Sequence, residues 1–384
     1  MIPNELVGDW SMAGMEVAIV ETASGLAVRF PEAPEGFENL LEQTSESSYL
    51  VRGGPFDGAV LELSTDDAGG MVPTVGGVVP LSRLDRPATA PPGSGLVAPE
   101  FVPTAEEEAA FASLWQSIAH RADGRTIDEE IAGPSHRFVQ WLMAQDAVIF
   151  HGSNRLDIDE FQPQRTSMEL NDTGGRGNLG AVYGTHDGLW SMFFAVVDRG
   201  RLRGSIRNGS MRFETTSRDR SVDMYHFSIH HEVLATAPFT TGALYLFQRD
   251  VFERLPFYPG GPMSNEWACH EPLRPLARLT VSPEDFPFLS GIGGHDDGPL
   301  LALDDLGTQV YDGVVSARRT EGGFEIVTSA DATIVDRFID LSADFYPDVT
   351  RVAEPTDDGV RVTMTGPPAF VHNLERRLED HLER

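Results

Sequence analysis

A stretch rich in proline, alanine and glycine at residues 86–104 (RPATAPPGSGLVAPEFVPT) divides this chain into unequal parts. Such a composition is typical of a linker. The 384 residues also exceed the size that one hydrophobic core usually serves, which favours two or three domains. We therefore expect a small domain at residues 1–85, a central domain at 105–290 and a C-terminal domain at 300–384.

The first 85 residues contain short runs in which apolar and polar side chains alternate, and each run is bounded by Gly, Pro, Asp or Ser. This pattern predicts the strands of a small antiparallel β-barrel. The runs lie at residues 16–20, 26–30, 48–52 and 59–63. With the opening LVGDW at 6–10, the segment resembles the lipocalin-like barrels appended to serine hydrolases of the β-lactamase class. Because no catalytic residues accompany it, we expect an accessory or oligomerisation domain.

Two helices are expected at the start of the central domain. Thr104 is a favourable N-cap residue, and three glutamates follow in the first turn. A second helix is predicted at about residues 135–144, with Phe138, Trp141 and Leu142 on its apolar face. Strands then follow at 148–150, 211–213, 225–229, 243–247 and 276–281.

A glycine-rich segment at residues 291–299 (GIGGHDDGP) predicts a second domain boundary. Beyond it we expect two or more strands, helices at 332–345 and 368–382, and a strand at 359–364. This is a small α+β domain in which no residue set suggests chemistry. The predicted fold class is therefore α+β and multidomain, with an N-terminal barrel, a central sheet with helices and a C-terminal α+β unit.

The chain is strongly acidic, with a net charge of −30, and all 29 of its basic residues are arginine. This charge opposes general binding to nucleic acid or to anionic membranes, whose phosphates it would repel. We interpret a local group of arginines as a solvated loop, although it could contact a phosphate. The group consists of Arg199, Arg201, Arg203 and Arg207.

The cysteine content and the N-terminal sequence indicate in which cellular compartment the protein is expected. Cys269 is the single cysteine, so an internal disulfide and a cysteine-rich metal site are excluded. The opening MIPNELVGDW lacks a basic region followed by an apolar one, and no apolar run approaches the ~20 residues that span a bilayer. We expect a cytoplasmic protein.

Three fragments carry the candidate site residues. The first is an apolar run that ends in His151-Gly152-Ser153. The second contains Tyr183, followed by Ser191 and Phe194, and the third contains Glu266 within SNEW at 264–267. Side chains of these types suit cleavage of the bond between nicotinamide and ribose, a reaction that passes through an oxocarbenium-like centre. Flat rings hold the nicotinamide, polar groups orient the ribose, and a carboxylate stabilises the developing positive charge.

The fragments resemble the motifs of the His-Tyr-Glu class of ADP-ribosyltransferases, which contains the poly(ADP-ribose) polymerases and diphtheria toxin. Phe150-His151-Gly152-Ser153 matches the first motif. GAVYGT at 180–185 matches the second with one residue more before Tyr183, and it lacks the Phe-Ala pair usual in the polymerases. Ser191 and Phe194 lie 8 and 11 residues after Tyr183, at the offsets of the carboxamide-binding serine and the aromatic platform. Asn265-Glu266-Trp267 matches the third motif, Asn-Glu-Tyr, with tryptophan in place of tyrosine.

The resemblance covers about residues 145–290 and implies an ADP-ribosyltransferase-like split β-sheet with NAD as substrate. It implies transfer of ADP-ribose to an unknown acceptor (a protein, a nucleic acid or a small molecule), or hydrolysis of NAD in the same pocket. By this resemblance, Glu266, His151 and Tyr183 are catalytic. The implied NAD-binding residues are His151, Gly152, Ser153, Tyr183, Ser191, Phe194 and Arg155. Of these, Ser153 and Arg155 would lie on the adenosine side.

Other readings remain open. The pocket could bind NAD or an ADP-ribosylated partner without turnover, or the barrel could make this an interaction protein. His226, His230, His231 and Glu232 read as part of an edge strand without a third ligand at useful spacing, so no metal site is predicted. We interpret the acidic residues at 157–160 as a solvated loop. The glycines at 174–177 lack a strand-turn-helix context, and residues 264–271 lack a nucleophile elbow.

Overall fold

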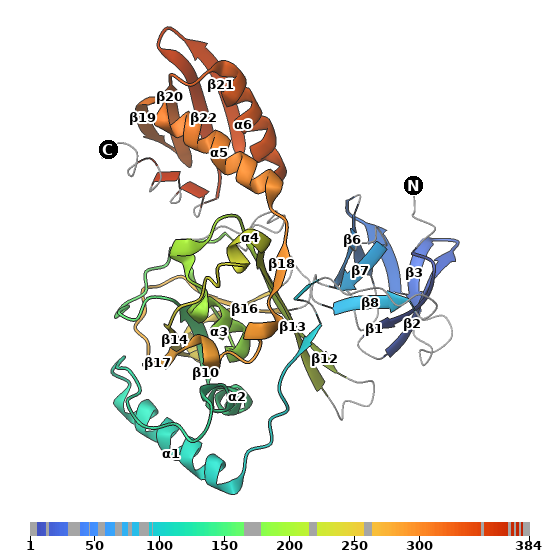
Figure 1. Cartoon of the computed structure of the whole chain (residues 1–384), viewed down its shortest axis with the longest axis vertical. Helices are drawn as coiled ribbons and strands as arrows, with labels where there is room; N and C mark the ends of the chain where they lie inside the picture. Colours follow the sequence, from blue (N-terminus) through green and yellow to red (C-terminus); the bar gives the residue numbers. More distant parts are fainter. Residues whose placement is uncertain are drawn as a thin grey trace.

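The computed structural model describes residues 6–12, 15–29, 39–45, 47–52, 58–65, 71–75, 79–83, 92–93, 95–164, 178–214, 221–256, 263–346 and 349–367, with residues 370–371, 374–375 and 378. The fold is mixed α+β, as predicted. Most of its elements are strands, and the chain folds into three bodies (Figure 1). The glycine-rich turn at 174–177 and most of the helix predicted at 368–382 lie outside the described residues. Among the described residues, no helix combines the length and apolarity that crossing a bilayer requires.

Eight antiparallel strands form the N-terminal body. Each strand pairs with the next along the chain, and the first also pairs with the last, which closes the sheet into a barrel. The barrel interior is filled by side chains such as Trp10, Tyr49 and Leu61, as expected for a barrel of this size. The strands are β1 (Gly8–Met12), β2 (Met15–Thr22), β3 (Gly25–Arg29), β4 (Asn39–Gln43), β5 (Ser48–Arg52), β6 (Val60–Thr65), β7 (Met71–Val75) and β8 (Val79–Arg83).

Both predicted helices of the central body are present, as α1 (Ala105–Arg121) and α2 (Ser135–Gln145). Thr104 and Glu107 form a reciprocal capping box, which satisfies amide groups that the first turn leaves unpaired. Arg137 on α2 bonds the same Glu107 carboxylate at 2.7 Å and so joins the two helices. Phe111 and Phe138 pack ring to ring with centroids 5.4 Å apart.

A six-stranded antiparallel sheet forms the centre of this body, in the order β15-β16-β11-β10-β14-β17. Its strands are β10 (Val148–Ser153), β11 (Val182–Thr185), β14 (Gly242–Gln248), β15 (Glu253–Pro256), β16 (Met263–Cys269) and β17 (Ala277–Val281). Helix α3 (Gly188–Val196) packs on β10 and β14. The sequence pattern did not predict α3, because a helix that is apolar on almost every side has no amphipathic period.

A second sheet has the order β12-β13-β18, and β9 also pairs with β13. These strands are β9 (Leu96–Val97), β12 (Ile206–Glu214), β13 (Ser221–His230) and β18 (Gly293–His295), and the short helix α4 (His231–Leu234) follows β13. The prediction that residues 226–232 form an edge strand is wrong, because β13 lies between β12 and β18.

The two predicted boundaries of the central domain also need correction. Within the predicted linker 86–104, Leu96–Val97 pairs with β13, and the Pro99 carbonyl accepts a bond from Gln140. At the other end, β18 extends the central body beyond residue 290. Composition misled the prediction at both places because glycine is needed where these segments cross. A Cβ on Gly293 would lie 2.1 Å from the Pro92 carbonyl atoms, and one on Gly93 would lie 2.0 Å from the Phe227 oxygen.

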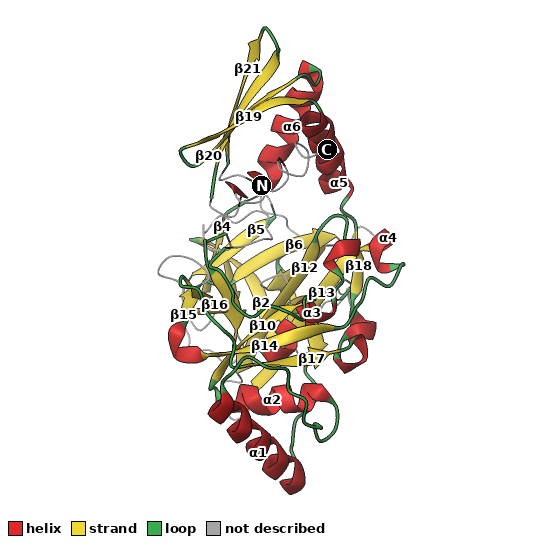
Figure 2. Ribbon diagram, turned by 90° about the vertical axis from the view of Figure 1, so that its left-hand side faces the viewer, coloured by secondary structure: helices red, strands yellow, loops and turns green. Residues whose placement is uncertain are grey.

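The C-terminal body is a four-stranded antiparallel sheet in the order β19-β20-β22-β21, with two helices against it (Figure 2). Its elements are α5 (Gly298–Asp312), β19 (Val314–Thr320), β20 (Gly323–Thr328), α6 (Ala332–Phe345), β21 (Thr350–Thr356) and β22 (Gly359–Thr365). The predicted helix at 332–345 and strand at 359–364 are confirmed. Helix α5 was not predicted.

Candidate functional site

The three motif fragments lie on adjacent strands of the six-stranded sheet. His151 and Gly152 are on β10, Tyr183 is on β11 and Glu266 is on β16, and β11 lies between the other two strands. The register joins Phe150 to Thr185 and Thr185 to Glu266. Adjacent strands lie about 5 Å apart, so residues far apart in the sequence meet within roughly 10 Å of backbone.

Strands β10 and β11 separate just beyond Phe150. Their register contains the single pair Phe150–Thr185, whereas β10 continues to pair with β14 as far as Ser153. At the point of separation, the His151 imidazole bonds the Tyr183 carbonyl, with 2.7 Å between Nδ1 and the oxygen. The ring also contacts Phe161 edge-on, at 4.9 Å between centroids. His151 therefore occupies the split between two strands that would otherwise continue to pair.

The protonation state of His151 follows from these contacts. A carbonyl oxygen only accepts, so Nδ1 carries the hydrogen and donates it. Burial lowers the pKa of His151 to about 4, and the nearby positive charge of Arg199 acts in the same direction. The imidazole is therefore neutral near pH 7, and Nε2 presents a lone pair that can accept a hydrogen bond from a hydroxyl group.

Gly152 is the point at which α3 contacts β10. A Cβ built on Gly152 would lie 1.9 Å from the Ser191 carbonyl oxygen and 2.9 Å from the Ala195 amide nitrogen. No side chain fits such a gap, so glycine is required for this approach. Ser191 itself is buried, at 2% exposure. The close approach brings the second motif's helix onto the strand of the first.

Phe194 lies in the last turn of α3, and Arg199 follows shortly after the helix ends at Val196. The Arg199 guanidinium carbon is 5.8 Å from the centroid of the half-buried Phe194 ring, and its charge also acts on His151. Arg199 belongs to a short 3₁₀ turn that Asp198 caps. Arg199 is exposed, as the interpretation of a solvated loop predicts, but its guanidinium also lies beside Phe194 of α3.

Glu266 is half-buried, and its backbone N–H donates to Ser264 Oγ at 3.0 Å. Side chains alternate along a strand, so Glu266 leaves the sheet on the side of Phe150 and Thr185. His151 pairs with Tyr245 and leaves toward the other side. A ligand that contacts both residues must therefore reach both faces of the sheet at the split between β10 and β11, and cannot lie on one flat face.

Neighbours of Glu266 connect the two sheets. Asn265 Nδ2 donates to Ser210 Oγ on β12 at 2.8 Å. Trp267 Nε1 donates to His186 Nδ1 at 3.0 Å, and the Arg249 guanidinium lies 4.9 Å from the Trp267 ring centroid. Both side chains flanking Glu266 are thus fixed by partners outside β16.

The remaining predicted residues take other positions. The Tyr183 hydroxyl accepts the Leu179 amide at 2.8 Å, so the phenol oxygen bonds the preceding loop. Ser153 Oγ accepts the Arg155 amide at 3.2 Å in a tight turn. The Arg155 guanidinium bonds Asp157 at 3.1 Å in solvent. The structure therefore does not bring Arg155 to His151 or Glu266.

A shallow hollow of about 490 Å³ lies elsewhere on the central body. Its lining includes Trp267 and Arg249, but none of the eight predicted site residues contributes to it. By contrast, the hydrogen bond of His151 and the close contacts of Gly152 fix specific polar groups.

No family model, curated protein or solved structure matches this chain. A functional assignment therefore depends on the geometry and the chemistry of these residues.

Sequence reasoning missed one buried acid beside the site. Asp187 is 4% exposed and caps α3, where its Oδ1 accepts the Trp190 amide at 3.0 Å and the Tyr225 hydroxyl at 3.2 Å. Burial raises the pKa of Asp187 to about 6, and the Asp223 carboxylate acts in the same direction. Its position directly before an apolar run, where an N-cap is favoured, is a pattern that could have identified it.

We expect Asp187→Asn to stabilise the protein above pH 7 and to leave its stability near pH 4 almost unchanged. The native state holds this proton up to about pH 6, whereas an unfolded aspartate releases it near 4, so the native state is relatively stabilised at low pH. That stabilisation is lost as the pH rises through 6. Asparagine keeps the cap without the charge, and should raise the free energy of unfolding by about 2 kcal/mol at pH 8.

Urea denaturation of both proteins at pH 4.5 and pH 8 measures this difference. Asp331→Asn is the matched control, because Asp331 caps α6 from an exposed position and accepts the Thr333 amide at 2.8 Å. Hydrogen bonding to Thr333 lowers the pKa of Asp331, so its substitution should destabilise the protein at pH 8. An equal response of the two variants would contradict the role of burial at Asp187.

Proposed function

We propose that the central body is an ADP-ribosyltransferase-like domain that binds NAD and transfers its ADP-ribose to an acceptor with release of nicotinamide. The observation that carries the proposal is the order β16-β11-β10, which aligns the Glu, Tyr and His motifs on adjacent strands. The close contact of Gly152 with α3 adds Ser191 and Phe194 to the same region. The split between β10 and β11 supplies the place where NAD would enter.

Each part of the site has a role in this reaction. His151 Nε2 would accept a hydrogen bond from a hydroxyl of the nicotinamide-side ribose. The Gly152 backbone and the Ser191 hydroxyl would hold the carboxamide, and the rings of Tyr183 and Phe194 would contact the nicotinamide. These interactions orient the substrate, and orientation accounts for much of the rate that an enzyme provides.

The chemical step breaks the bond between the ribose C1′ and the nicotinamide nitrogen. The bonding electrons leave with the ring, which departs neutral, and C1′ takes on positive charge. The Glu266 carboxylate would bond the 2′-hydroxyl and stabilise that charge. The acceptor, or a water molecule, then bonds C1′ and loses a proton to solvent, so that NAD and acceptor yield the ADP-ribosyl adduct, nicotinamide and H⁺.

One departure from the polymerase motif has a local cause. Gly184 stands where the polymerases have phenylalanine, and a Cβ there would lie 2.3 Å from Ile149 Cγ2. The approach of β11 to β10 thus leaves no space for a larger residue at this position. The departure reflects strand packing and does not remove a group that would touch NAD.

Arg199 is the residue that we assign to the NAD phosphates. Its guanidinium lies beside Phe194 in a chain of net charge −30, where a dianionic pyrophosphate needs a local cation. We expect Arg199→Ala to weaken NAD binding about tenfold, near the lower end of the ~1.5–3 kcal/mol typical of a charged hydrogen bond, because the side chain is exposed. The turnover number should change little.

Isothermal titration calorimetry with NAD at two salt concentrations measures the effect of Arg199. Arg203→Ala is the matched control, because Arg203 is exposed and pairs with Asp305 at 3.7 Å. Equal affinity losses in the two variants would indicate a general charge effect instead of a phosphate contact.

The test of the function itself is nicotinamide release when the full chain is mixed with NAD, followed by chromatography. Release supports the proposal, and label from [adenylate-³²P]NAD on added protein, RNA or small-molecule acceptors then identifies the acceptor class. Binding without release would indicate a silent NAD-binding module. No binding by calorimetry would overturn the proposal.

A further inference from the structure

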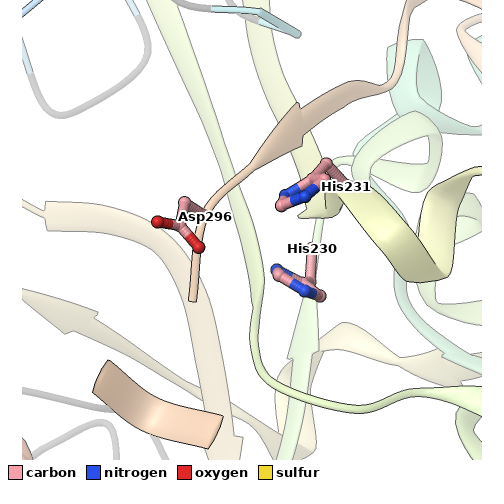
Figure 3. Close-up of side chains that lie close together, drawn as sticks. All are labelled: His230, His231 and Asp296. Carbon is pink, nitrogen blue, oxygen red and sulfur yellow. The ribbon is translucent and has the colours of Figure 1, made fainter. Parts of the chain in front are cut away.

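A cluster of metal-ligating side chains lies at the junction between the central body and α5. His230 ends β13, His231 begins α4, and Asp296 lies between β18 and α5 (Figure 3). One ligand atom from each residue lies within 4.8 Å of the other two. Because Asp296 is more than 60 residues beyond the histidines, only the parallel pairing of β13 with β18 brings the three together.

The donor types fit a borderline divalent cation such as Zn²⁺. Imidazole nitrogen and carboxylate oxygen bind Zn²⁺ at about 2.0–2.2 Å, so ligand atoms in a loaded site lie roughly 3.3 Å apart. The present spacing would have to contract by about 1.5 Å at most. His230 is buried at 3% exposure, whereas His231 and Asp296 are exposed and can move toward it.

The surrounding groups prepare His231 for coordination. Its Nδ1 bonds the His295 carbonyl at 3.2 Å, and since a carbonyl only accepts, Nδ1 carries the hydrogen. Nε2 is then unprotonated and can bind a cation, in the arrangement by which a carbonyl usually orients a metal-ligating histidine. The exposed Glu232 carboxylate, 3.9 Å from His230 Nε2, offers a fourth oxygen.

Two neighbours limit the site. The Asp297 amide donates to His230 Nδ1 at 3.2 Å, and this hydrogen bond must break if Nε2 binds the metal and Nδ1 takes up the hydrogen, because two N–H groups would then face each other. Arg207 bonds the Asp296 carbonyl at 3.2 Å, but the Asp297 carboxylate at 3.3 Å offsets its charge. Neither contact uses the Asp296 carboxylate, whose Oδ1 accepts the Gly298 amide.

We propose that His230, His231 and Asp296 bind one Zn²⁺-type cation, with Glu232 or water as the fourth ligand. The cation would join the end of β13 to the segment that leads into α5. It would thereby fix the connection between the central and C-terminal bodies. The site shares no residue with the proposed NAD pocket.

The experiment is equilibrium dialysis of the full chain against Zn²⁺, with metal measured by mass spectrometry, for the wild type and for His231→Ala and Asp296→Ala. We expect one Zn²⁺ per chain in the wild type. Each substitution should weaken binding more than about 100-fold, beyond the range typical of outer-shell changes. Both side chains are exposed, so the variants should retain the far-ultraviolet circular dichroism of the folded protein.

His120→Ala is the control, because His120 is exposed on α1 and lies outside the cluster. Co²⁺ provides a second readout, since tetrahedral coordination gives strong visible absorption that octahedral aqueous Co²⁺ lacks. Loss of both the Zn²⁺ stoichiometry and the Co²⁺ absorption in the His231 and Asp296 variants alone supports the site. Absence of Zn²⁺ binding in the wild type, or binding that both variants retain, would overturn it.

Discussion

Glu266→Gln is expected to reduce nicotinamide release from NAD by 10²–10³-fold, which corresponds to about 2.7–4 kcal/mol of transition-state stabilisation. Glutamine has nearly the same shape and can still bond a ribose hydroxyl, so the affinity for NAD should change less than about threefold. The difference arises because the carboxylate charge matters only once C1′ becomes positive. An interaction made mainly in the transition state appears in the turnover number and not in binding.

Single-turnover kinetics and calorimetry on the same preparation separate these two quantities. Glu253→Gln is the matched control, because Glu253 lies on the neighbouring strand β15, where it pairs with Ala268, and is exposed. Wild-type release in Glu253→Gln together with loss in Glu266→Gln supports the assignment. Full activity of Glu266→Gln would remove Glu266 from the chemistry.

Gly152→Ala is expected to lower the free energy of unfolding by about 3 kcal/mol, among the largest effects of a single methyl group. The new Cβ would lie 1.9 Å from the Ser191 carbonyl oxygen, which is helix backbone and cannot rotate away as a side chain would. Helix α3 must therefore move off β10. Since α3 carries Ser191 and Phe194, NAD affinity should fall as well, even under conditions in which the variant is folded.

Chemical denaturation followed by circular dichroism measures the loss. Gly298→Ala is the control, because a Cβ there meets only Asp296 carboxylate oxygens at 3.5 Å or more, in the first turn of a helix. Alanine favours helices, so the control should be neutral or slightly stabilising. A loss below 1 kcal/mol in Gly152→Ala would mean that α3 relaxes easily and that this contact does not fix the site.

Elements defined by local patterns were predicted well. The capping residues of α1 and the alternating runs of the barrel are local features, and both appear as expected. The spacing of Leu300, Leu303, Leu306 and Val310 in α5 is also helical, but the Gly, Asp and Pro residues before it led to the interpretation of a boundary. Strands β9 and β18 are two or three residues long and gain their structure from β13, so no local pattern defines them.

In the candidate site too, local features could be predicted from the sequence and long-range contacts could not. The order and spacing of His151, Tyr183 and Glu266 are visible in the sequence, as are the offsets of Ser191 and Phe194. The strand register that places His151 in the split between β10 and β11 cannot be read from the sequence, because it depends on pairs of residues far apart in the chain.

The contacts of residues outside the motifs could not be predicted either, although the capping position of Asp187 follows a local pattern. Arg199, Asp187 and Asp296 each gain their significance from contacts with other elements: Arg199 with Phe194, Asp187 with Tyr225, and Asp296 with the two histidines. Single-sequence patterns do not contain such long-range contacts.

Gly93 and Gly293 lie in two segments that both pair with β13, and these segments determine the shortest fragment of the chain that would keep the central body intact. The segment that enters from the barrel bonds β13 through the Gly93 carbonyl and Leu96–Val97, and the departing segment bonds the same strand through β18. A protease that cut between residues 83 and 92 would spare both attachments, and the barrel would still contact β13 through Met224, which packs in the barrel core. Trimming to the helix start at residue 105, or back to residue 290, would remove one of them and leave β13 with an unpaired, aggregation-prone flank.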